Sequence, residues 1–303
     1  MMKPRIVFMG TPEFAVASLD ALIKAEHNVV GVITAPDKPA GRGMKMSETA
    51  VKKYAREHSL HILQPEKLKS PEFLSQLKAL KADLHVVVAF RMLPEVVWNM
   101  PPMGTINVHA SLLPKYRGAA PINWAIINGE KETGVTTFKL THEIDTGNIL
   151  LQQKVNIEDE DDAGTLHDKL KQAGASLLLK TIDGLKNNSI AEQPQVDHVT
   201  IHAPKLTSET ARINWNEPVE KIHNLIRGLS PYPAALTLLN NKVFKIYRSE
   251  FKHVKPLKTP GEFETDNKSY LRFAGPDGYI YAKNVQAEGK KRMDVAEFLR
   301  GFR

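Results

Sequence analysis

The chain has 303 residues, of which 42% are hydrophobic and 25% charged, as is typical of a folded globular protein. It contains no cysteine, which excludes disulfides, zinc–thiolate sites and thiol catalysis, and no apolar run approaches the roughly 18 residues of a membrane-spanning helix. The formal charge is +7, and residues 209–303 carry a net +6 from 17 Lys and Arg against 11 Asp and Glu. This basic final third suits either a solvated surface or a polyanionic partner such as RNA.

Strand and helix signals alternate through the first half of the chain. Arg5–Met9 and Leu84–Phe90 are continuous apolar runs, as in strands of a parallel sheet that helices cover on both faces. The basic, apolar start is too short for a signal peptide and ends in Gly10-Thr11-Pro12, so we interpret it as the first core strand. The other predicted elements are strands at 29–34 and 105–109 and helices at 12–25, 47–58, 71–80 and 119–128.

The second half changes character. Two further strands, predicted at 133–140 and 148–155 as edge strands, precede a long amphipathic helix at 165–184, and the acidic run 158–162 suits the positive end of its dipole. Residues 187–208 are polar and proline-rich, which indicates a linker between domains 1–186 and 209–303. The last part combines a helix at 218–227 with short strands separated by turns. A small β-barrel is expected there, with the five-stranded oligonucleotide-binding (OB) type as one candidate.

The most informative feature is the string Asn107–Gly118, together with a second motif, Asp145–Gly147, further along the chain. If residues 105–109 form a strand, Asn107 and His109 emerge on the same face, and Ile106 and Val108 pack behind them. An amide beside an imidazole, with a carboxylate nearby, can catalyse acyl transfer without a metal, and no metal site is expected.

Competing motifs are incomplete. Gly10 supplies only one of the three glycines of the dinucleotide fingerprint, and no Walker sequence occurs. The single Asp-Thr-Gly at 145–147 lacks the second carboxylate that an aspartic protease needs.

The string Asn-x-His-x-Ser-Leu-Leu-Pro at 107–114, with Asp-Thr-Gly at 145–147, resembles the folate-dependent formyltransferases. Four other stretches agree with this family: Gly10–Ala15, Pro36–Gly43, Gly118–Ile122 and Lys205–Thr207. The resemblance covers essentially the whole chain. It implies an α/β, Rossmann-like catalytic domain with a mostly parallel sheet (1–186), a linker and a C-terminal OB-like β-barrel domain (209–303).

The resemblance also implies a reaction. We expect an enzyme of translation initiation that transfers the formyl group of 10-formyltetrahydrofolate to the α-amino group of methionyl initiator tRNA. The amine attacks the formyl carbon directly, and a tetrahedral intermediate with an oxyanion follows. The Asn107 amide can donate to that oxyanion, while His109 can donate when protonated and can shuttle the proton. Asp145 either orients His109 or accepts the amine's proton through water.

The same family implies that four consecutive residues line the folate pocket: Ser111, Leu112, Leu113 and Pro114. The chain departs from the family at the wall of that pocket. The family usually has Tyr-Gly-Leu-Ile-Leu-Pro, whereas here residues 90–94 are one residue shorter and place Arg91 at the glycine position.

Binding of tRNA is expected at two places, the basic domain 209–303 and the loop 34–47. The loop carries Lys38, Arg42 and Lys45 against the single acid Asp37, and the family uses this insertion to reach the acceptor stem. A solvated loop without a partner is the competing interpretation.

Other acceptors remain open: an amino sugar-nucleotide, glycinamide ribonucleotide or another amine, or water in a 10-formyltetrahydrofolate hydrolase. A non-catalytic RNA-binding protein is a further alternative, against which the intact Asn, His and Asp set argues. We expect a cytoplasmic monomer with no membrane partner.

Overall fold

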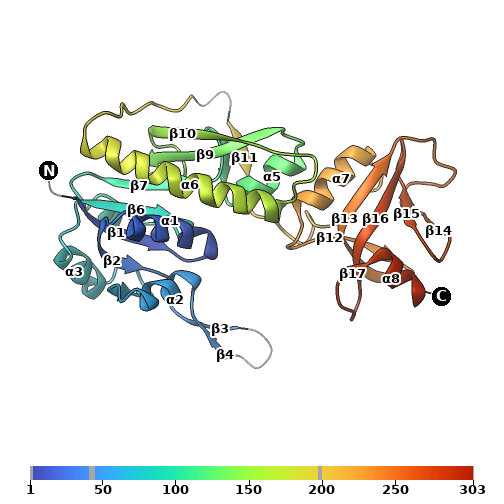
Figure 1. The fold of residues 1–303 in the computed structure, drawn as a ribbon, viewed down its shortest axis with the longest axis horizontal. Coiled ribbons are helices and arrows are strands. Elements are labelled where there is room, and N and C mark those ends of the chain that lie inside the picture. Colours follow the sequence, from blue (N-terminus) through green and yellow to red (C-terminus); the bar gives the residue numbers. More distant parts are fainter. Residues whose placement is uncertain (1–2, 41–44, 197–199, 303) are drawn as a thin grey trace. The chain divides into compact units, whose positions relative to one another are not determined.

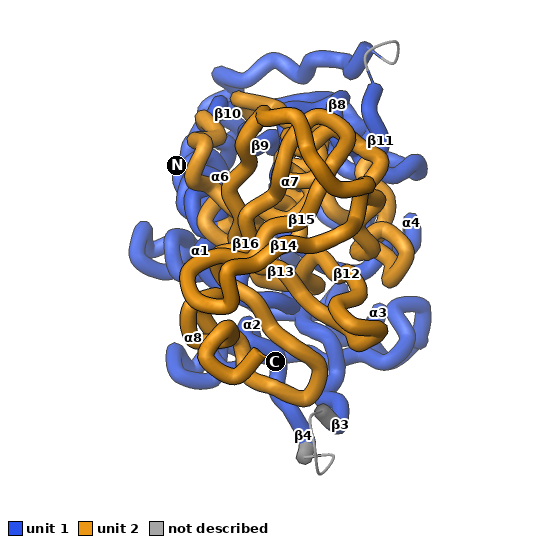
Figure 2. Tube along the Cα trace, turned by 90° about the vertical axis from the view of Figure 1, so that its right-hand side faces the viewer, with its two compact units in different colours: residues 1–118, 134–155, 168–202 blue, residues 119–133, 156–167, 203–303 orange. Residues whose placement is uncertain are grey.

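The computed structural model describes residues 3–40, 45–196 and 200–302 (Figure 1). The chain divides into two compact units, each assembled from several stretches (Figure 2). Unit 1 comprises residues 1–118, 134–155 and 168–202, and unit 2 comprises residues 119–133, 156–167 and 203–303. Among the described residues, no helix is long and apolar enough to cross a membrane.

Unit 1 is built on a seven-stranded sheet, whose strands in spatial order are β10 (Ile149–Asn156), β9 (Glu132–Lys139), β7 (Thr105–His109), β6 (Leu84–Val88), β1 (Arg5–Gly10), β2 (Asn28–Ile33) and β5 (Ile62–Leu63). The five strands from β5 to β7 run parallel, and β9 pairs antiparallel with β7. The mostly parallel α/β fold expected from the sequence is therefore confirmed. The carboxyl ends of β1, β6 and β7 share one edge, where open α/β sheets bind ligands.

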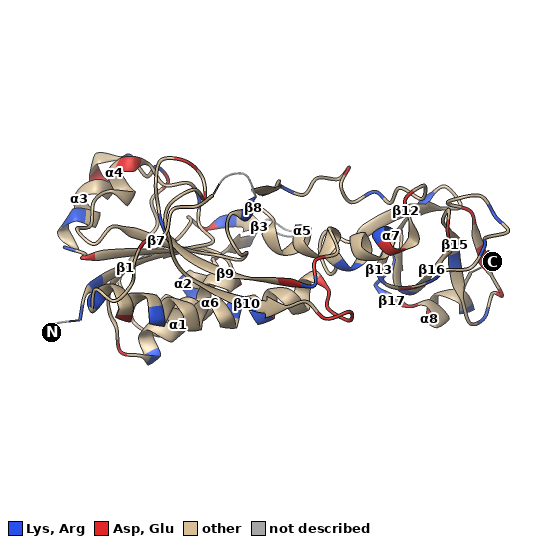
Figure 3. Ribbon diagram, turned by 90° about the horizontal axis from the view of Figure 1, so that it is seen from above, with Lys and Arg blue, Asp and Glu red and all other residues tan. Residues whose placement is uncertain are grey.

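Helices cover both faces of this sheet, as Figure 3 shows. Helices α1 (Glu13–Lys24) and α6 (Ala163–Lys186) lie on one face, and α3 (Pro71–Ala79) and α4 (Glu95–Trp98) lie on the other. Val7 and Met9 of β1 pack with Phe73 of α3, whereas the alternate β1 residues are equally buried towards the opposite face. This burial on both faces explains the unbroken apolar runs. Helix α2 (Ala50–Glu57) packs against α1.

Two predictions for unit 1 were wrong in part. Of the two strands predicted at an edge, β10 is at the edge, but β9 lies between β10 and β7. The predicted loop 34–47 contains a short antiparallel hairpin of β3 (Lys38–Ala40) and β4 (Lys45–Ser47). Three-residue strands with a proline in one of them carry too little alternation to be recognised from sequence.

The predicted linker also contributes pairings. Gln193 forms an isolated antiparallel bridge with Ile149 at the start of β10, and β11 (Ile201–Ala203) pairs with β8 (Lys115–Gly118). The segment is therefore partly ordered by pairing with β10 and β8 of unit 1. Its polar residues concealed this, because a bridge of one residue pair has no periodicity.

Unit 2 contains an antiparallel sheet that forms a curled half-barrel. Its strands are β12 (Ala235–Leu239), β13 (Lys242–Lys252), β16 (Tyr279–Ala287), β15 (Leu271–Ala274) and β14 (Phe263–Thr265), with β17 (Met293–Asp294) pairing β16. Irregular register near Arg248 bends β13 against β16. The core packs Phe244 and Phe273 of the sheet against Ile222 of α7 (Val219–Gly228). Helix α7 also contacts α5 (Pro121–Ile127), and α8 (Val295–Arg300) follows β17.

The acidic run 158–162 lies immediately before α6, which begins at Ala163, as the sequence predicts. The Asp162 carboxylate accepts a hydrogen bond from the Thr165 amide at 2.9 Å, which caps the helix. The Arg227 guanidinium donates to the carbonyl oxygens of Glu158 and Asp161 at 3.3 and 3.0 Å. The run is thus explained by local structure within unit 2.

Candidate active site

Strand β7 places the predicted amide and imidazole side by side on one face. Asn107 is half-buried and His109 is 7% exposed. Ile106 and Val108 are buried on the other face, where Gly174 of α6 approaches so closely that a Cβ there would lie 3.0 Å from Val108 Cγ1. The alternation predicted from the sequence therefore holds, with α6 behind the strand.

His109 lies between two hydrogen-bond acceptors. Its Nε2 is 2.9 Å from the carbonyl oxygen of Tyr116, and its Nδ1 is 3.8 Å from Asp145 Oδ2. The ring can donate with both nitrogens only in its protonated form, in which Asp145 would face the positive charge. The imidazole is thus placed to hold a proton between a backbone carbonyl and a carboxylate.

Asp145 sits in a tightly constrained turn. Its Oδ2 accepts a hydrogen bond from the Gly118 amide at 3.0 Å, and its backbone has a φ of 55°, in the left-handed region. Gly147 is required by packing, because a Cβ there would lie 1.6 Å from the carbonyl oxygen of Lys139. The Asp-Thr-Gly motif therefore reflects both a carboxylate aimed at His109 and a close backbone approach to β9.

The Asn107 amide retains unused hydrogen-bonding capacity. Its Oδ1 is buried and has no partner within the described part of the chain. Leaving a buried polar atom unpaired costs about 1–3 kcal/mol. This oxygen is therefore free to accept a hydrogen bond from a group that is not part of the described chain, beside the His109 and Asp145 pair.

The predicted folate loop is held by one hydroxyl of β9. Thr136 Oγ1 donates to the Ser111 carbonyl at 2.6 Å and accepts from the Leu113 amide at 3.1 Å and from Gln152 Nε2 at 2.9 Å. Gln152 Nε2 also donates to the Leu113 carbonyl at 2.9 Å. Ser111 and Leu113 are buried, whereas Leu112 and the cis-linked Pro114 are half-buried. The loop is therefore pre-shaped next to the strand that carries Asn107 and His109.

Arg91, the unusual residue of the shortened wall, reaches towards the loop that follows β5. Its guanidinium donates to the carbonyl oxygens of Pro65 and of Glu66, the latter at 2.9 Å, and it lies 5.5 Å from the centre of the Phe90 ring. Burial lowers the pKa of Arg91. The Arg91 side chain thus links the shortened segment 90–94 to the loop after β5 through hydrogen bonds.

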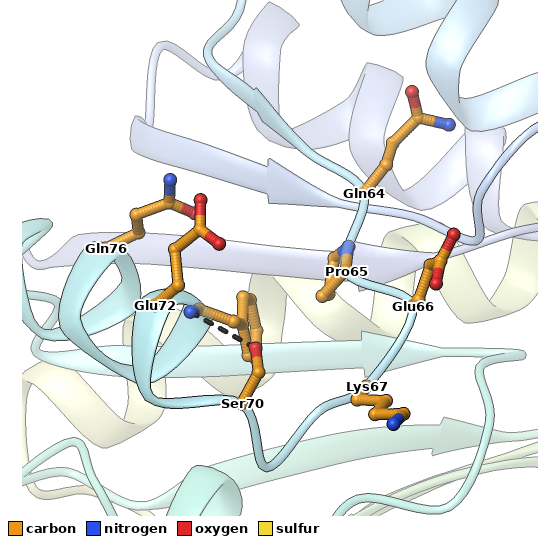
Figure 4. A pocket seen from close by; sticks show the side chains of 8 residues that line it. Gln64, Pro65, Glu66, Lys67, Ser70, Glu72 and Gln76 are labelled. Carbon is orange, nitrogen blue, oxygen red and sulfur yellow. Dashed lines mark hydrogen bonds between the residues drawn. The ribbon is translucent and has the colours of Figure 1, made fainter.

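That loop borders a pocket of about 440 Å³ between β5 and α3 (Figure 4). Its lining is largely polar and contains none of Asn107, His109 and Asp145. At its rim the Ser70 hydroxyl caps α3 by accepting from the Phe73 amide at 3.3 Å. The lining residues are Gln64, Pro65, Glu66, Lys67, Ser70, Glu72, Phe73 and Gln76.

Two of the three predicted tRNA-contacting cations lie in β3 and β4. Lys38 is exposed, Lys45 lies in β4, and Arg42 lies outside the described residues. At the hairpin base, the hydrogen bond from Lys52 Nζ is the main reason that the pKa of Asp37 is lowered, and Gln64 Nε2 donates to the same carboxylate at 2.8 Å. The single acid of the hairpin is therefore neutralised by a lysine of α2.

Sequence reasoning missed three supporting residues, namely Thr136, Gln152 and Gln195. Thr136 and Gln152 lie within predicted strands, where nothing distinguishes a structural hydroxyl from one that holds a loop. Gln195 lies in the segment predicted as a linker, yet its side chain contacts the backbone of Asp145. No pattern in the sequence pointed to it.

Comparisons with known proteins match both parts of the chain to one family. Residues 4–182 match the family described as formyl transferase, and residues 205–303 match the formyl transferase C-terminal domain. A curated relative, the methionyl-tRNA formyltransferase of Bacteroides fragilis, is 52% identical over 98% of this chain and 95% of its own length.

Solved structures share the fold at lower identity. The sugar 3N-formyl transferase WlaRD, crystallised in the presence of dTDP and 5-N-formyl-THF, aligns with a TM-score of 0.69 at 22% identity over 96% of this chain and 100% of its own. HypX from Aquifex aeolicus, in complex with tetrahydrofolic acid, gives 0.67 at 16% identity over 98% of this chain and 47% of its own.

Proposed function

This chain belongs to the formyl transferase family, and we propose that it transfers the formyl group of 10-formyltetrahydrofolate to the α-amino group of methionyl initiator tRNA. Relatives that are about half identical to this chain over nearly their whole length are named methionyl-tRNA formyltransferase. Their name gives methionyl-tRNA as the acceptor. Formylation of initiator tRNA serves translation initiation, and a cytoplasmic location is part of this proposal.

The observation that carries this proposal is the buried, unpartnered amide oxygen of Asn107, beside His109 and Asp145. Acyl transfer from a formyl donor develops negative charge on the formyl oxygen, and a preorganised amide is a suitable donor for it. The Asn107 amide has both a donor and an acceptor group, so its NH₂ can face the oxyanion while Oδ1 accepts from a substrate N–H.

The proposed reaction proceeds by direct attack. The amine nitrogen forms a bond to the formyl carbon, and the carbonyl electrons move onto oxygen, where Asn107 stabilises them. Collapse of this intermediate breaks the bond from carbon to N10 of the folate, and N10 takes up the proton that the amine loses. His109 and Asp145 relay that proton, because the ring lies 3.8 Å from the carboxylate and can carry the charge between them.

The loop Ser111–Pro114 is proposed to hold the folate. Its backbone is fixed by Thr136, so the loop need not order itself when the ligand binds. Folate derivatives are present with two proteins of the same fold. We propose that the formyl donor enters along the wall that Arg91 secures.

Acceptor binding is proposed to use the β3–β4 hairpin and the basic C-terminal sheet. On that sheet, cations lie against rings: Arg292 is 4.4 Å from the centre of Tyr247, and Lys252 is 5.3 Å from that of Tyr281. Cations interleaved with aromatic rings suit a phosphate backbone with accessible bases. Such contacts predict tRNA binding that weakens as salt rises.

The test is a formyl-transfer assay with the purified full chain, 10-formyltetrahydrofolate and methionyl initiator tRNA. Parallel reactions offer an amino sugar-nucleotide, glycinamide ribonucleotide, or water alone as acceptor. We expect formyl-methionyl-tRNA as the main product and a KM for tRNA that rises with ionic strength. Preferential formylation of a small amine, or release of formate without transfer, would contradict the proposal.

A further inference from the structure

The side chain of Gln195 joins two parts of the candidate active site. Its Oε1 accepts two hydrogen bonds from Arg117, from Nε at 3.0 Å and Nη2 at 2.7 Å. Its Nε2 donates to the carbonyl oxygens of Asp145 at 2.9 Å and of Gly147 at 2.8 Å. All four hydrogen-bonding positions of the amide are therefore used. Reversing the amide would set its NH₂ against the guanidinium and its oxygen against two carbonyls, so the partners fix its orientation.

The turn that Gln195 holds is the one that carries the carboxylate. Asp145 has a left-handed φ of 55°, a conformation that costs a non-glycine residue free energy and persists only when its surroundings enforce it. Gln195 bonds the backbone on both sides of Thr146, at residues 145 and 147. It thus restrains the backbone from which the Asp145 carboxylate projects.

The other partner of Gln195 belongs to the strand that contacts the catalytic pair. Arg117 is 8% exposed, and its neighbours in β8 supply the carbonyl of Tyr116 to His109 and the amide of Gly118 to Asp145. One amide therefore ties β8 to the Asp145 turn. Any change in the distance between these two segments would alter the 3.8 Å separation of His109 and Asp145.

We propose that Gln195 is a positioning residue for Asp145, and that the segment after α6 contributes this residue to the active site. This inference rests on the proposed formyl transfer. Gln195 touches no reacting atom in it; its amide sets the place of the carboxylate relative to His109. The segment enters the site through the Gln193 bridge to Ile149, which brings residue 195 to the turn.

The decisive variant is Gln195→Ala, with Gln193→Ala as its matched control. Gln193 lies two residues away, its side chain is exposed, and its bridge to Ile149 uses only backbone groups, which the substitution keeps. We expect Gln195→Ala to lower kcat about 10- to 100-fold, the effect of a small misplacement of a catalytic group. KM for 10-formyltetrahydrofolate and for tRNA should stay within about twofold, because no binding contact is lost. Gln193→Ala should match the wild type.

Gln195→Glu separates the two halves of the interaction. It keeps an acceptor for Arg117 but turns an oxygen towards the carbonyls of Asp145 and Gly147. We expect kcat of Gln195→Glu to fall at least as far as that of Gln195→Ala. Full activity would mean that only the hydrogen bonds from Arg117 matter and would contradict a role in positioning Asp145. If the alanine variant does not fold, Gln195→Glu provides the test of the proposal.

The proposal is overturned if kcat of Gln195→Ala stays within about twofold of Gln193→Ala, or if only KM changes. It also fails if neither Gln195 variant folds, since the residue is then purely structural. These outcomes are distinct from failure of the proposed function, in which the wild type itself transfers no formyl group to methionyl initiator tRNA.

Discussion

Thr136 offers a direct test of how the folate loop is held. The variant Thr136→Val keeps the shape of the side chain but removes the hydroxyl that bonds the Ser111 carbonyl and the Leu113 amide. Thr136 is fully buried, so water cannot replace those bonds without a rearrangement. The loop Ser111–Pro114 would then lose its anchor to β9.

The size of the effect follows from the groups left behind. Two buried backbone groups become unpaired, and each costs about 1–3 kcal/mol, so the free energy of unfolding should fall by roughly 2–6 kcal/mol. The KM for 10-formyltetrahydrofolate should also rise, because the loop, without its anchor, would have to become ordered when the folate binds. The KM for tRNA should change little.

Thr137→Val is the matched control. Thr137 is adjacent and equally buried, but its hydroxyl bonds Thr181 of α6 at 2.8 Å and accepts from the Leu151 amide at 3.2 Å. Urea unfolding and steady-state kinetics of both variants provide the comparison. Both should be destabilised, but only Thr136→Val should raise the folate KM. Equal folate KM values for the two variants would refute the role given to Thr136.

Three further predictions concern other parts of the chain. Gly147→Ala should lower kcat by at least about 10²-fold, because its Cβ would lie 1.6 Å from the Lys139 carbonyl and displace the Asp145 turn; normal kinetics would contradict this. Burial lowers the pKa of His85 to about 4 from 6.5, so the unfolded chain takes up this proton first as pH falls. The free energy of unfolding should therefore decrease by up to about 3 kcal/mol between pH 6.5 and 4 relative to His85→Leu, and parallel pH profiles in urea unfolding would exclude it. Asp37→Asn should lower the KM for tRNA about two- to fivefold, because it removes the acid beside the hairpin cations and the ion pair that neutralises Lys52; an unchanged KM for tRNA would contradict this, and the folate KM is the internal control.

The sheet of unit 1 could be predicted because its central strands are short, mostly apolar segments that are buried on both faces. Leu84–Val88 is buried throughout and apolar except for His85, so composition and environment largely agree. Asn107 and His109 could be placed on one face because strand alternation is strict. Strand alternation could not predict the partner of His109 Nε2, because that partner is the backbone carbonyl of Tyr116. No side-chain pattern indicates such a contact.

The rest of the site depends on contacts between distant and irregular segments. Gln195 meets Asp145 across 50 residues, and the segment that carries it resembles a linker in composition. The β3–β4 hairpin and the β8–β11 pair are too short for an alternating pattern, so propensity and periodicity could not detect them. Arg91 was recognised as unusual, but only the structure shows that it bonds the carbonyls of residues 65 and 66.

The central claim is that the Asn107 amide stabilises the transition state of formyl transfer. The most direct measurement is the single-turnover rate of formyl transfer to methionyl initiator tRNA by Asn107→Ala, with Asn99→Ala, an exposed asparagine, as control. We predict a rate about 10²–10³-fold below that of the wild type, with a melting temperature no lower than that of the wild type and an unaffected control. A rate close to that of the wild type would contradict the account.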